Sequence, residues 1–266
     1  MSEGNRSKRI AAVTGASSGI GRAFARRLAT EGYDLLLIAR RIERLESVAK
    51  EIRADGDSHV EVFAADLTDS EQRRVIEKRL ASEPRLAMLV NSAGFGTAGR
   101  LSEISPERIE REIQLNVIAT IVLTHAALRA MIPKQSGAIL NVSSAVGFQP
   151  NPFFANYGAT KAYLTNVSDA LADEVRKDGI RVLAVCPGPV RTEFGNVANI
   201  DDDRFPRFTV VSPEQVVEES LRALRRGSRV CIPGIAMRTT AWLTRHLPAS
   251  FTRLFYREFG RFFYRT

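Results

Sequence analysis

The clearest chemical signal in the sequence is a tyrosine and a lysine four residues apart, Tyr157 and Lys161. On a helix, side chains with this spacing project from one face and can act on a single ligand. A tyrosine with an ordinary pKa near ~10 is a weak acid at neutral pH, and a nearby ammonium group lowers that pKa by stabilising the phenolate. The pair predicts a proton carrier, although the same spacing also arises by chance on surface helices.

A glycine-rich turn near the N-terminus is the second signal. Residues 14–21 read TGASSGIG and lie between an apolar strand candidate and a helix candidate. Glycines allow the backbone to turn tightly and approach a pyrophosphate, whose charge is met by amide groups at the start of the following helix. Such a turn alone is a weak motif, and a purely structural turn is the alternative. The residues expected to contact a dinucleotide are Gly15, Ser17, Gly19, Ile20 and Gly21.

The end of the second apolar run indicates which dinucleotide binds. NAD-binding sites of this kind place a carboxylate ~20 residues after the turn, where it holds the ribose hydroxyls. Here the run ends in Ala39, Arg40 and Arg41. A guanidinium binds phosphate oxygens with charge-assisted hydrogen bonds, whereas an acid would repel them. The sequence therefore predicts NADP(H), with Arg40 at the 2′-phosphate and Arg41 as an exposed residue that opens the next helix.

Short apolar runs alternate with amphipathic segments from residue 9 onward, which is the pattern of strand-helix units around a parallel sheet. We predict one α/β domain of the Rossmann type, a doubly wound parallel sheet of about seven strands with helices on both faces. The expected strands are 10–13, 34–38, 60–64, 86–91, 138–142, 181–185 and 229–232, and the expected helices are 21–30, 41–54, 70–81, 106–131, 156–177 and 213–226. Residues 1–233 form the predicted catalytic domain, with 195–212 as an irregular substrate loop, and 234–266 form a basic amphipathic extension of it.

Five further motifs follow the glycine turn in a fixed order. They are residues 91–94 (NSAG), Asn116, Ser144, residues 157–161 (YGATK) and residues 187–192 (PGPVRT). With the turn, they resemble the TGxxxGxG, NNAG, helix asparagine, catalytic serine, YxxxK and PG motifs of the short-chain dehydrogenase/reductase family, with Ser92 as a tolerated change. The resemblance spans residues 8–194, and this ordered set is far more specific than any single motif.

The resemblance implies a role for each catalytic residue. Tyr157 donates a proton to the carbonyl oxygen during reduction and removes it during oxidation, while Ser144 hydrogen-bonds the reacting oxygen. Lys161 tunes Tyr157 and binds the nicotinamide ribose, and Asn116 holds a water that links Lys161 to solvent. The hydride comes from the cofactor, so the protein supplies orientation and electrostatics. Ser143 is chemically equivalent to Ser144, and spacing alone favours Ser144.

The same resemblance assigns further contacts with the cofactor. Asp66 and Asn91 are expected near the adenine, and Val190 and Thr192 near the nicotinamide amide. Tyr157 and Lys161 belong to the cofactor site as well as to the catalytic set. For Asp66, a capping role at the start of the helix near Asp69 is the alternative.

Composition narrows the other classes of function. The formal net charge of +8 raises the possibility of a nucleic-acid or anionic membrane partner, but no nucleic-acid-binding motif accompanies it, and no nucleic acid is expected to bind. His59, His125, His246, Cys186 and Cys231 lack metal-ligand spacing, so no metal is expected. Two distant cysteines and an N-terminal segment without a signal-like apolar stretch predict a cytoplasmic protein, and no apolar run approaches the length of a membrane span.

The C-terminal segment is basic and rich in aromatic residues. Residues 234–266 contain six arginines and one acid, Glu258, interleaved with tryptophan, leucine and phenylalanine. In helical form, spacings of three and four separate the apolar residues from most of the arginines. Such a segment suits a cap over the substrate pocket, a subunit interface, or peripheral contact with an anionic membrane through residues 237–266.

Phenylalanines next to the motifs predict an apolar substrate pocket, and they are Phe95, Phe148, Phe153, Phe154 and Phe194. The expected substrate pair is a hydrophobic ketone or aldehyde and its alcohol. A 3-oxoacyl carrier-protein reductase is the enzymatic alternative, and a non-catalytic NADP(H)-binding sensor or scaffold is the alternative from another class. The family resemblance also implies a homo-dimer or tetramer.

Overall fold

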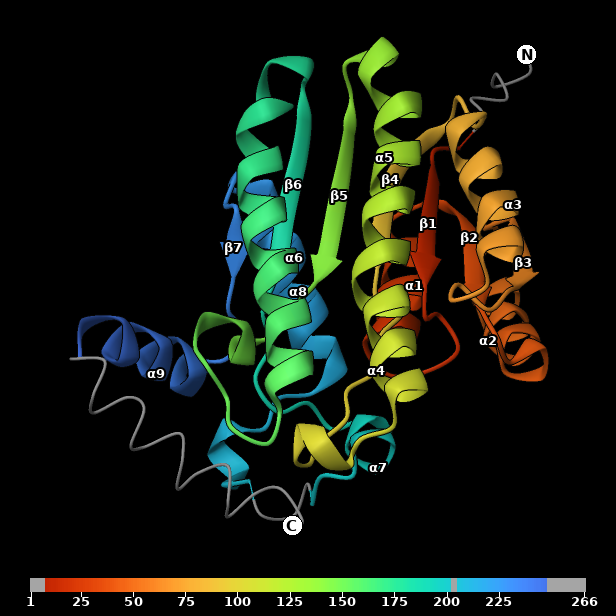
Figure 1. Ribbon diagram of the computed structural model, residues 1–266. Coiled ribbons are helices and arrows are strands. Elements are labelled where there is room, and N and C mark those ends of the chain that lie inside the picture. Colours follow the sequence, from red (N-terminus) through yellow and green to blue (C-terminus); the bar gives the residue numbers. More distant parts are fainter. Residues whose placement is uncertain (1–7, 202–204, 248–266) are drawn as a thin grey trace, which may run out of the picture.

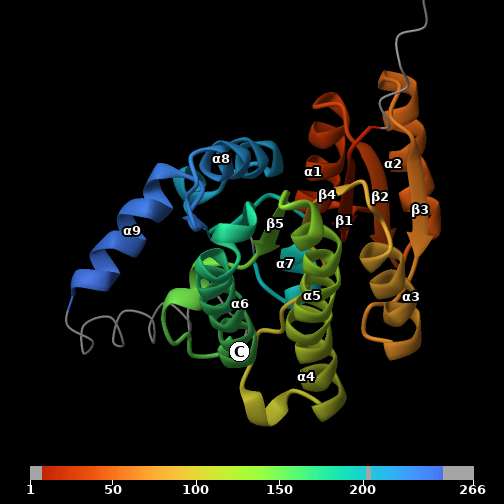
Figure 2. The same ribbon diagram turned by 90° about the horizontal axis from the view of Figure 1, so that it is seen from above.

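Seven parallel strands form one sheet, in the order β3-β2-β1-β4-β5-β6-β7, in the computed structural model, which describes residues 8–201 and 205–247 (Figure 1). The strands are β1 (Ile10–Thr14), β2 (Asp34–Ala39), β3 (Val60–Ala64), β4 (Leu86–Asn91), β5 (Gly137–Val142), β6 (Ile180–Val185) and β7 (Val230–Cys231). Helices cover both faces of the sheet (Figure 2), which confirms the predicted doubly wound α/β fold. The helices are α1 (Gly19–Thr30), α2 (Ile42–Asp55), α3 (Ser70–Ala81), α4 (Pro106–Ile113), α5 (Thr120–Met131), α6 (Ala155–Glu174), α7 (Phe194–Ala198), α8 (Pro213–Arg225) and α9 (Ile235–His246).

The alternation of side chains along the strands divides the interior into two apolar layers. In β1, Ala11 and Val13 lie in a core shared with α1, α2 and α8, whereas Ile10 and Ala12 lie in a core shared with α3, α5 and α6. Every residue of β1 and β2 is buried. A central parallel strand that is covered on both faces must be apolar on both faces, which is why these segments read as continuous apolar runs.

The order of the strands determines where a ligand can bind. Strands β2 and β3 follow β1 in sequence and lie on one side of it within the sheet. The chain then crosses over, and β4 lies on the other side of β1. Loops that leave β1 and β4 therefore diverge at the carboxyl edge of the sheet, and ligands of doubly wound folds bind in the crevice at this point. The glycine turn follows β1, and the NSAG motif begins at the end of β4.

Two predicted elements differ from the structure. The helix expected over residues 106–131 is continuous but contains a π-helical segment, Gln114–Ala119, between α4 and α5. The segment 195–212, expected to be irregular, begins with the short helix α7 and ends where Val190 and Val211 form an isolated parallel bridge. The five residues of α7 are too few for a periodic pattern to be recognisable in the sequence.

The sequence holds no uninterrupted apolar run of membrane-span length, but the helical stretch Pro106–Lys134 reaches that length with polar residues in between. In the described part of the chain, it alone is long and apolar enough, with 29 residues and a mean hydropathy of 1.7 over its best window. Half of that window is buried, and α5 packs against the sheet and against α3. Its apolar character is therefore accounted for by its place in the core.

Helix α9 leaves the sheet and projects to one side of the molecule (Figures 1 and 2). It contacts the 3-10 turns Ala145–Phe148 and Arg207–Thr209, both at the carboxyl edge of the sheet. The predicted C-terminal extension is thus described only as far as Leu247, and residues 248–266 lie outside the described part of the chain.

Candidate active site

Helix α6 carries the tyrosine and the lysine on its buried face. Tyr157 is 6% exposed and Lys161 is 5% exposed, and Lys161 Nζ lies 5.5 Å from the centroid of the Tyr157 ring. The rings of Phe154 and Phe194 lie against Tyr157, at centroid distances of 4.4 and 5.3 Å. The four-residue spacing therefore brings the phenol and the amine to one site, where both border a cavity.

Burial determines the electrostatics of Lys161. Its Nζ donates a hydrogen bond to the backbone oxygen of Val142 at 2.7 Å. Desolvation lowers the pKa of Lys161 to about 8, while Cys186 and Glu112 act in the opposite direction. An amine with this pKa is mainly an ammonium at pH 7, so it can stabilise negative charge on the Tyr157 oxygen.

The structure distinguishes the two adjacent serines. Ser143 Oγ donates to the backbone oxygen of Lys161 at 2.7 Å and lies 2.8 Å from Thr165 Oγ1. Ser144 Oγ makes only longer contacts, 3.4 Å to the oxygen of Pro187 and 3.4 Å from the Val146 amide. Both serines border the cavity. Because the Ser143 hydroxyl already has two good partners, the geometry favours Ser144 as the group that is free to meet a ligand oxygen.

Asn116 lies in the π-helical segment between α4 and α5 and is fully buried. Its Nδ2 donates to the oxygen of Phe95 at 2.9 Å and to Thr160 Oγ1 at 3.1 Å, and its Oδ1 accepts from the amide of Phe95 at 3.1 Å. The side chain thus joins the loop after β4 to α6, next to Lys161. π-Helical turns within α-helices are frequent at functional sites. The water expected between Asn116 and Lys161 stays a prediction.

The glycine turn has the geometry of a pyrophosphate site. Gly15 and Gly19 have φ values of +67° and +52°, and a Cβ on Gly15 would lie 2.9 Å from the Ala93 backbone. Helix α1 begins at Gly19 without a side-chain hydrogen bond from Ser18 and without an acid in its first turn. Its first amide groups therefore suit an anion, and the residues present fit a dinucleotide pyrophosphate.

The predicted contacts of this turn divide into two groups. Gly15, Ser17, Gly19 and Ile20 line the cavity. Gly21 is not part of the lining, and a methyl group there would collide with the backbone oxygen of Gly15. Gly21 therefore allows α1 to pack closely on the glycine turn, and it contributes to the site through this packing.

Both arginines after β2 border the cavity, which corrects the prediction for Arg41. Arg40 is exposed at the end of the strand, as expected for a phosphate-binding residue. Arg41 does open α2, but its Nη2 donates to Ser18 Oγ at 3.0 Å and to Ser17 Oγ at 3.3 Å, on the glycine turn. Arg41 is thus a component of the site and more than the first residue of an exposed helix.

Asp66 has a structural role at the edge of the cavity. Its Oδ1 accepts from the Thr68 amide and hydroxyl, at 3.0 and 2.7 Å, and its Oδ2 forms an ion pair with Arg111 at 3.4 Å. The cap of α3 is Asp69, whose side chain accepts from two amides of the first turn. Asp66 therefore shapes the turn before α3 and can also meet a ligand.

The side chain of Asn91, a residue expected near the adenine, is held inside the core. It is 3% exposed, is not part of the cavity lining, and its Nδ2 donates to Asn141 Oδ1 at 2.9 Å and to Thr124 Oγ1 at 3.1 Å. It joins β4 to β5 and α5 inside the core. The following residues Ser92, Ala93 and Gly94 border the cavity instead.

Val190 and Thr192, which are expected near the nicotinamide amide, both border the cavity. Val190 is fixed by its bridge to Val211. Thr192 Oγ1 accepts from the Phe194 amide at 3.2 Å, and its methyl group lies against Gly19. This contact brings the loop after β6 close to the glycine turn, so the two cofactor segments form one continuous crevice.

The cavity has a volume of about 590 Å³ and is lined mainly by apolar groups near Tyr157. Of the five phenylalanines expected there, Phe95, Phe154 and Phe194 line it, whereas Phe148 and Phe153 do not. The segment after α7 and helix α9 also contribute, and their lining residues are Phe205, Pro206, Phe208, Thr209, Met237 and Thr240. Helix α9 is therefore part of the pocket wall, which was one of the roles open for the C-terminal segment.

Glu112 is a residue of this region that the sequence did not reveal. It is fully buried in α4, and its Oε1 accepts from the side-chain amide of Asn156 at 3.1 Å, next to Tyr157. Burial raises the pKa of the Glu112 carboxyl. Glu112 stands one helical turn before Asn116 and one after Arg108, and because both of these neighbours are polar, the sequence pattern gave no signal that Glu112 is buried.

Among residues 8–201 and 205–247, no cluster of three His, Cys, Asp or Glu side chains is placed to hold a metal ion. Burial raises the pKa of Cys186 to about 12 and that of Cys231 to about 11, so both thiols are protonated at neutral pH.

Comparisons with known proteins agree with this geometry. The model of the short chain dehydrogenase family matches residues 9–203. An uncharacterized oxidoreductase of Staphylococcus saprophyticus is 32% identical over 231 residues, which cover 86% of this chain and 97% of that protein. The chain therefore belongs to the short-chain dehydrogenase/reductase family, and it is an NAD(P)-dependent oxidoreductase that acts on CH–OH and C=O groups.

Two solved structures resemble the whole domain. A short-chain dehydrogenase from Sphingobium yanoikuyae in complex with NADPH has a TM-score of 0.82 and 35% identity, and the match covers 91% of this chain and 97% of that one. The bulky-bulky ketone specific alcohol dehydrogenase from Comamonas testosteroni has a TM-score of 0.78 and 30% identity, covering 96% of this chain and 93% of that one.

Proposed function

We propose that the protein is an NADP(H)-dependent oxidoreductase that interconverts a hydrophobic ketone or aldehyde and its alcohol. The observation that carries this proposal is the aromatic wall beside the proton carrier, where Phe154 and Phe194 lie 4.4 and 5.3 Å from the Tyr157 ring. An apolar pocket with few convergent polar groups favours an apolar ligand. The name of the Comamonas testosteroni relative, specific for bulky ketones, supports the same substrate class.

Each residue has a role in the proposed reaction. When bound, NADPH supplies the hydride. Ser144 donates a hydrogen bond to the carbonyl oxygen and holds it beside the Tyr157 hydroxyl, which donates the proton that completes the alcohol. The Lys161 ammonium favours the phenolate that this transfer leaves behind, and Asn116 fixes the loop after β4 against α6. In the oxidative direction, Tyr157 takes up the proton instead.

The proposed cofactor preference rests on charge. The crevice presents Arg40 and Arg41 after β2, where an NAD-specific site would carry an acid. The NADPH complex of the Sphingobium yanoikuyae relative supports the same choice. Gly15, Ser17, Gly19 and Ile20 would hold the pyrophosphate with α1, and Val190 and Thr192 the nicotinamide amide.

The proposed function can be tested with a panel of carbonyl compounds. The panel contains aryl ketones, steroid ketones, long-chain aldehydes and small sugars, each assayed with NADPH and with NADH by the absorbance of the reduced nicotinamide. We expect turnover of the bulky apolar carbonyls, with kcat/KM at least about tenfold higher with NADPH. Activity confined to small polar sugars would contradict the proposal. Acyl thioesters in the same panel test the 3-oxoacyl carrier-protein reductase, which would prefer them to free ketones.

We further propose that the protein is cytoplasmic and that it makes peripheral contact with an anionic membrane surface through residues 237–266. Leu243 of α9 and Leu247, which directly follows the helix, are exposed at 46% and 49%, and residues 234–266 contain six arginines against one acid. Apolar side chains that enter the interface, together with arginines that meet lipid phosphates, bind such a surface. Full-length protein should float with phosphatidylserine vesicles at low salt, and protein that lacks residues 248–266 should float less. If both float equally, this contact is wrong.

A homo-dimer or tetramer is also proposed, because members of the resembled family assemble in this way. The exposed apolar ring of Tyr163 on α6, at 43%, supports it. We expect light scattering after size exclusion to give two or four times the chain mass of 29.4 kDa. A monomer at micromolar concentration would contradict it.

A further inference from the structure

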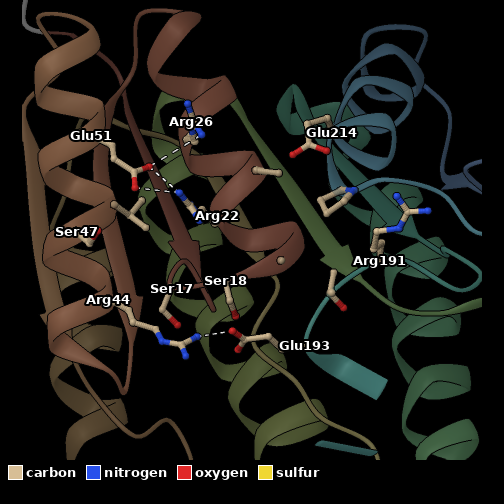
Figure 3. A pocket seen from close by; sticks show the side chains of 15 residues that line it. Ser17, Ser18, Arg22, Arg26, Arg44, Ser47, Glu51, Arg191, Glu193 and Glu214 are labelled. Carbon is tan, nitrogen blue, oxygen red and sulfur yellow. Dashed lines mark hydrogen bonds and ion pairs between the residues drawn. The ribbon is translucent and has the colours of Figure 1, made fainter. Parts of the chain in front are cut away.

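A carboxylate lies at the boundary between the apolar cavity and a second, polar one. Glu193 borders both, and the second cavity has a volume of about 620 Å³ (Figure 3). Its walls come from the glycine turn, from α1 and α2, from the loop between β6 and α7, and from the first residues of α8. Four arginines line this second cavity, Arg22, Arg26, Arg44 and Arg191.

Glu193 is held by two arginines of the opposite side of the crevice. Its Oε2 accepts a hydrogen bond from Arg41 Nη1 at 3.0 Å, and its Oε1 accepts one from Arg44 Nη1 (Figure 3 draws the second). These contacts keep the pKa of the Glu193 carboxyl below its ordinary value, with Arg44 as the larger cause. Glu193 is therefore an anion throughout the neutral range.

The Arg41 guanidinium thus binds one carboxylate and two hydroxyl groups. One nitrogen meets Glu193, and the other donates to the hydroxyls of Ser17 and Ser18 on the glycine turn. The two serine hydroxyls, which accept from Arg41, carry no charge and can accept from other donors at little cost, whereas the carboxylate has the same sign of charge as a phosphate. A phosphate monoester carries about 1.5 to 2 negative charges at pH 7, so it competes well for an arginine that now serves one carboxylate.

We propose that Glu193 competes with the 2′-phosphate of NADP(H) for Arg41, and so weakens the binding of NADP(H) without weakening that of NAD(H). This inference rests on the proposed cofactor preference, and it adds an acidic residue that opposes the effect of the arginines on the affinity for NADP(H). The ion pair is half exposed, with side-chain exposures of 41% for Arg41 and 49% for Glu193, so the phosphate can displace it.

Replacement of Glu193 by the phosphate at Arg41 also affects the part of the cavity next to Tyr157. Glu193 directly precedes Phe194, which begins α7 and packs on the Tyr157 ring. While Glu193 is bonded to Arg41 and Arg44, the segment that covers Tyr157 is tied to α2. When the phosphate binds Arg41, the ion pair between Glu193 and Arg41 is broken, and it forms again when the cofactor leaves.

The test is a direct binding titration of the full chain with the variant Glu193→Gln. Glutamine keeps the shape and a hydrogen-bond acceptor but removes the charge. Kd values for NADPH and NADH are measured at low salt by the fluorescence of the reduced nicotinamide. We expect the Kd for NADPH to fall about three- to fivefold, the upper end of the scale of one half-exposed ion pair, and that for NADH to change less than twofold.

Glu214→Gln is the matched control, because Glu214 is an exposed acid of the same polar cavity and lies across it from Arg44 (Figure 3). Its neutralisation should leave both Kd values unchanged; an equal gain there would assign the effect to general charge. An unchanged Kd for NADPH in Glu193→Gln, or weaker binding of both cofactors, overturns the inference. If the wild-type protein itself binds NADH more tightly than NADPH, the proposed cofactor is wrong, a failure visible without any variant.

Discussion

Replacing Tyr157 with phenylalanine should reduce kcat by about a thousandfold, the scale of a lost general acid, while the binding of cofactor is retained. The substitution removes one hydroxyl and keeps the ring that packs against Phe154 and Phe194. Steady-state rates with a bulky ketone and NADPH give the first quantity. The fluorescence titration used for Glu193 gives the second.

The same variant separates the enzyme from the alternative of a non-catalytic sensor. Tyr163 lies on the same helix, is 43% exposed and borders no part of the cavity, so Tyr163→Phe is a matched control that should keep full activity. Comparable turnover by Tyr157→Phe and wild type would remove Tyr157 from the chemistry. A wild-type protein that binds NADPH but turns over no carbonyl compound would instead favour the sensor.

Replacing Lys161 with methionine should lower kcat by about a hundredfold or more and, at the same time, stabilise the fold at neutral pH. A buried lysine with a pKa of about 8 rather than 10.5 carries an electrostatic penalty of about 3 kcal/mol in its charged form. Methionine removes this penalty but leaves the Val142 oxygen without its donor. We expect the free energy of unfolding at pH 7 to rise by about 1–3 kcal/mol, as measured by urea denaturation.

The difference in the free energy of unfolding between Lys161→Met and the wild type should depend on pH, and this dependence is the more specific measurement. The lowered pKa means that the folded protein binds fewer protons than the unfolded chain between about pH 8 and 10.5. The stability of the wild type should therefore rise with pH across this window relative to Lys161→Met, and the gap between them should narrow. A gap that stays constant would show that the Lys161 amine is not desolvated.

The sequence predicted the scaffold well because burial leaves strong local patterns. The observed bounds of β3, β4 and α3 coincide with the predicted ones, and β1 and β2 differ by a single residue at one end. Strands covered on both faces read as unbroken apolar runs, and α3 begins directly after a capping aspartate, Asp69. The pairing of Tyr157 with Lys161 was predictable for the same reason, because helix geometry alone relates them.

Contacts between distant segments were not predictable in this way. Arg41 and Glu193 are 152 residues apart, and nothing local to Arg41 distinguishes it from an ordinary residue at the start of a helix. The side-chain contacts of Asn91 were not predictable for a related reason. A motif gives the position of a residue along a strand, but the face on which its side chain lies depends on packing, and here Asn141 and Thr124 draw the amide into the core.

The π-helical turn Gln114–Ala119 sets the rotational phase between α4 and α5. One additional residue in a helical turn rotates the helix before it by about 100° relative to the helix after it. Glu112 therefore faces Asn156 and Asn116 faces Phe95 only while this irregularity persists. A variant in which this stretch is a uniform α-helix would gain regular backbone hydrogen bonds but would lose the alignment of both side chains. At this point of the chain, a more regular helix would therefore be obtained at the expense of the geometry of the site.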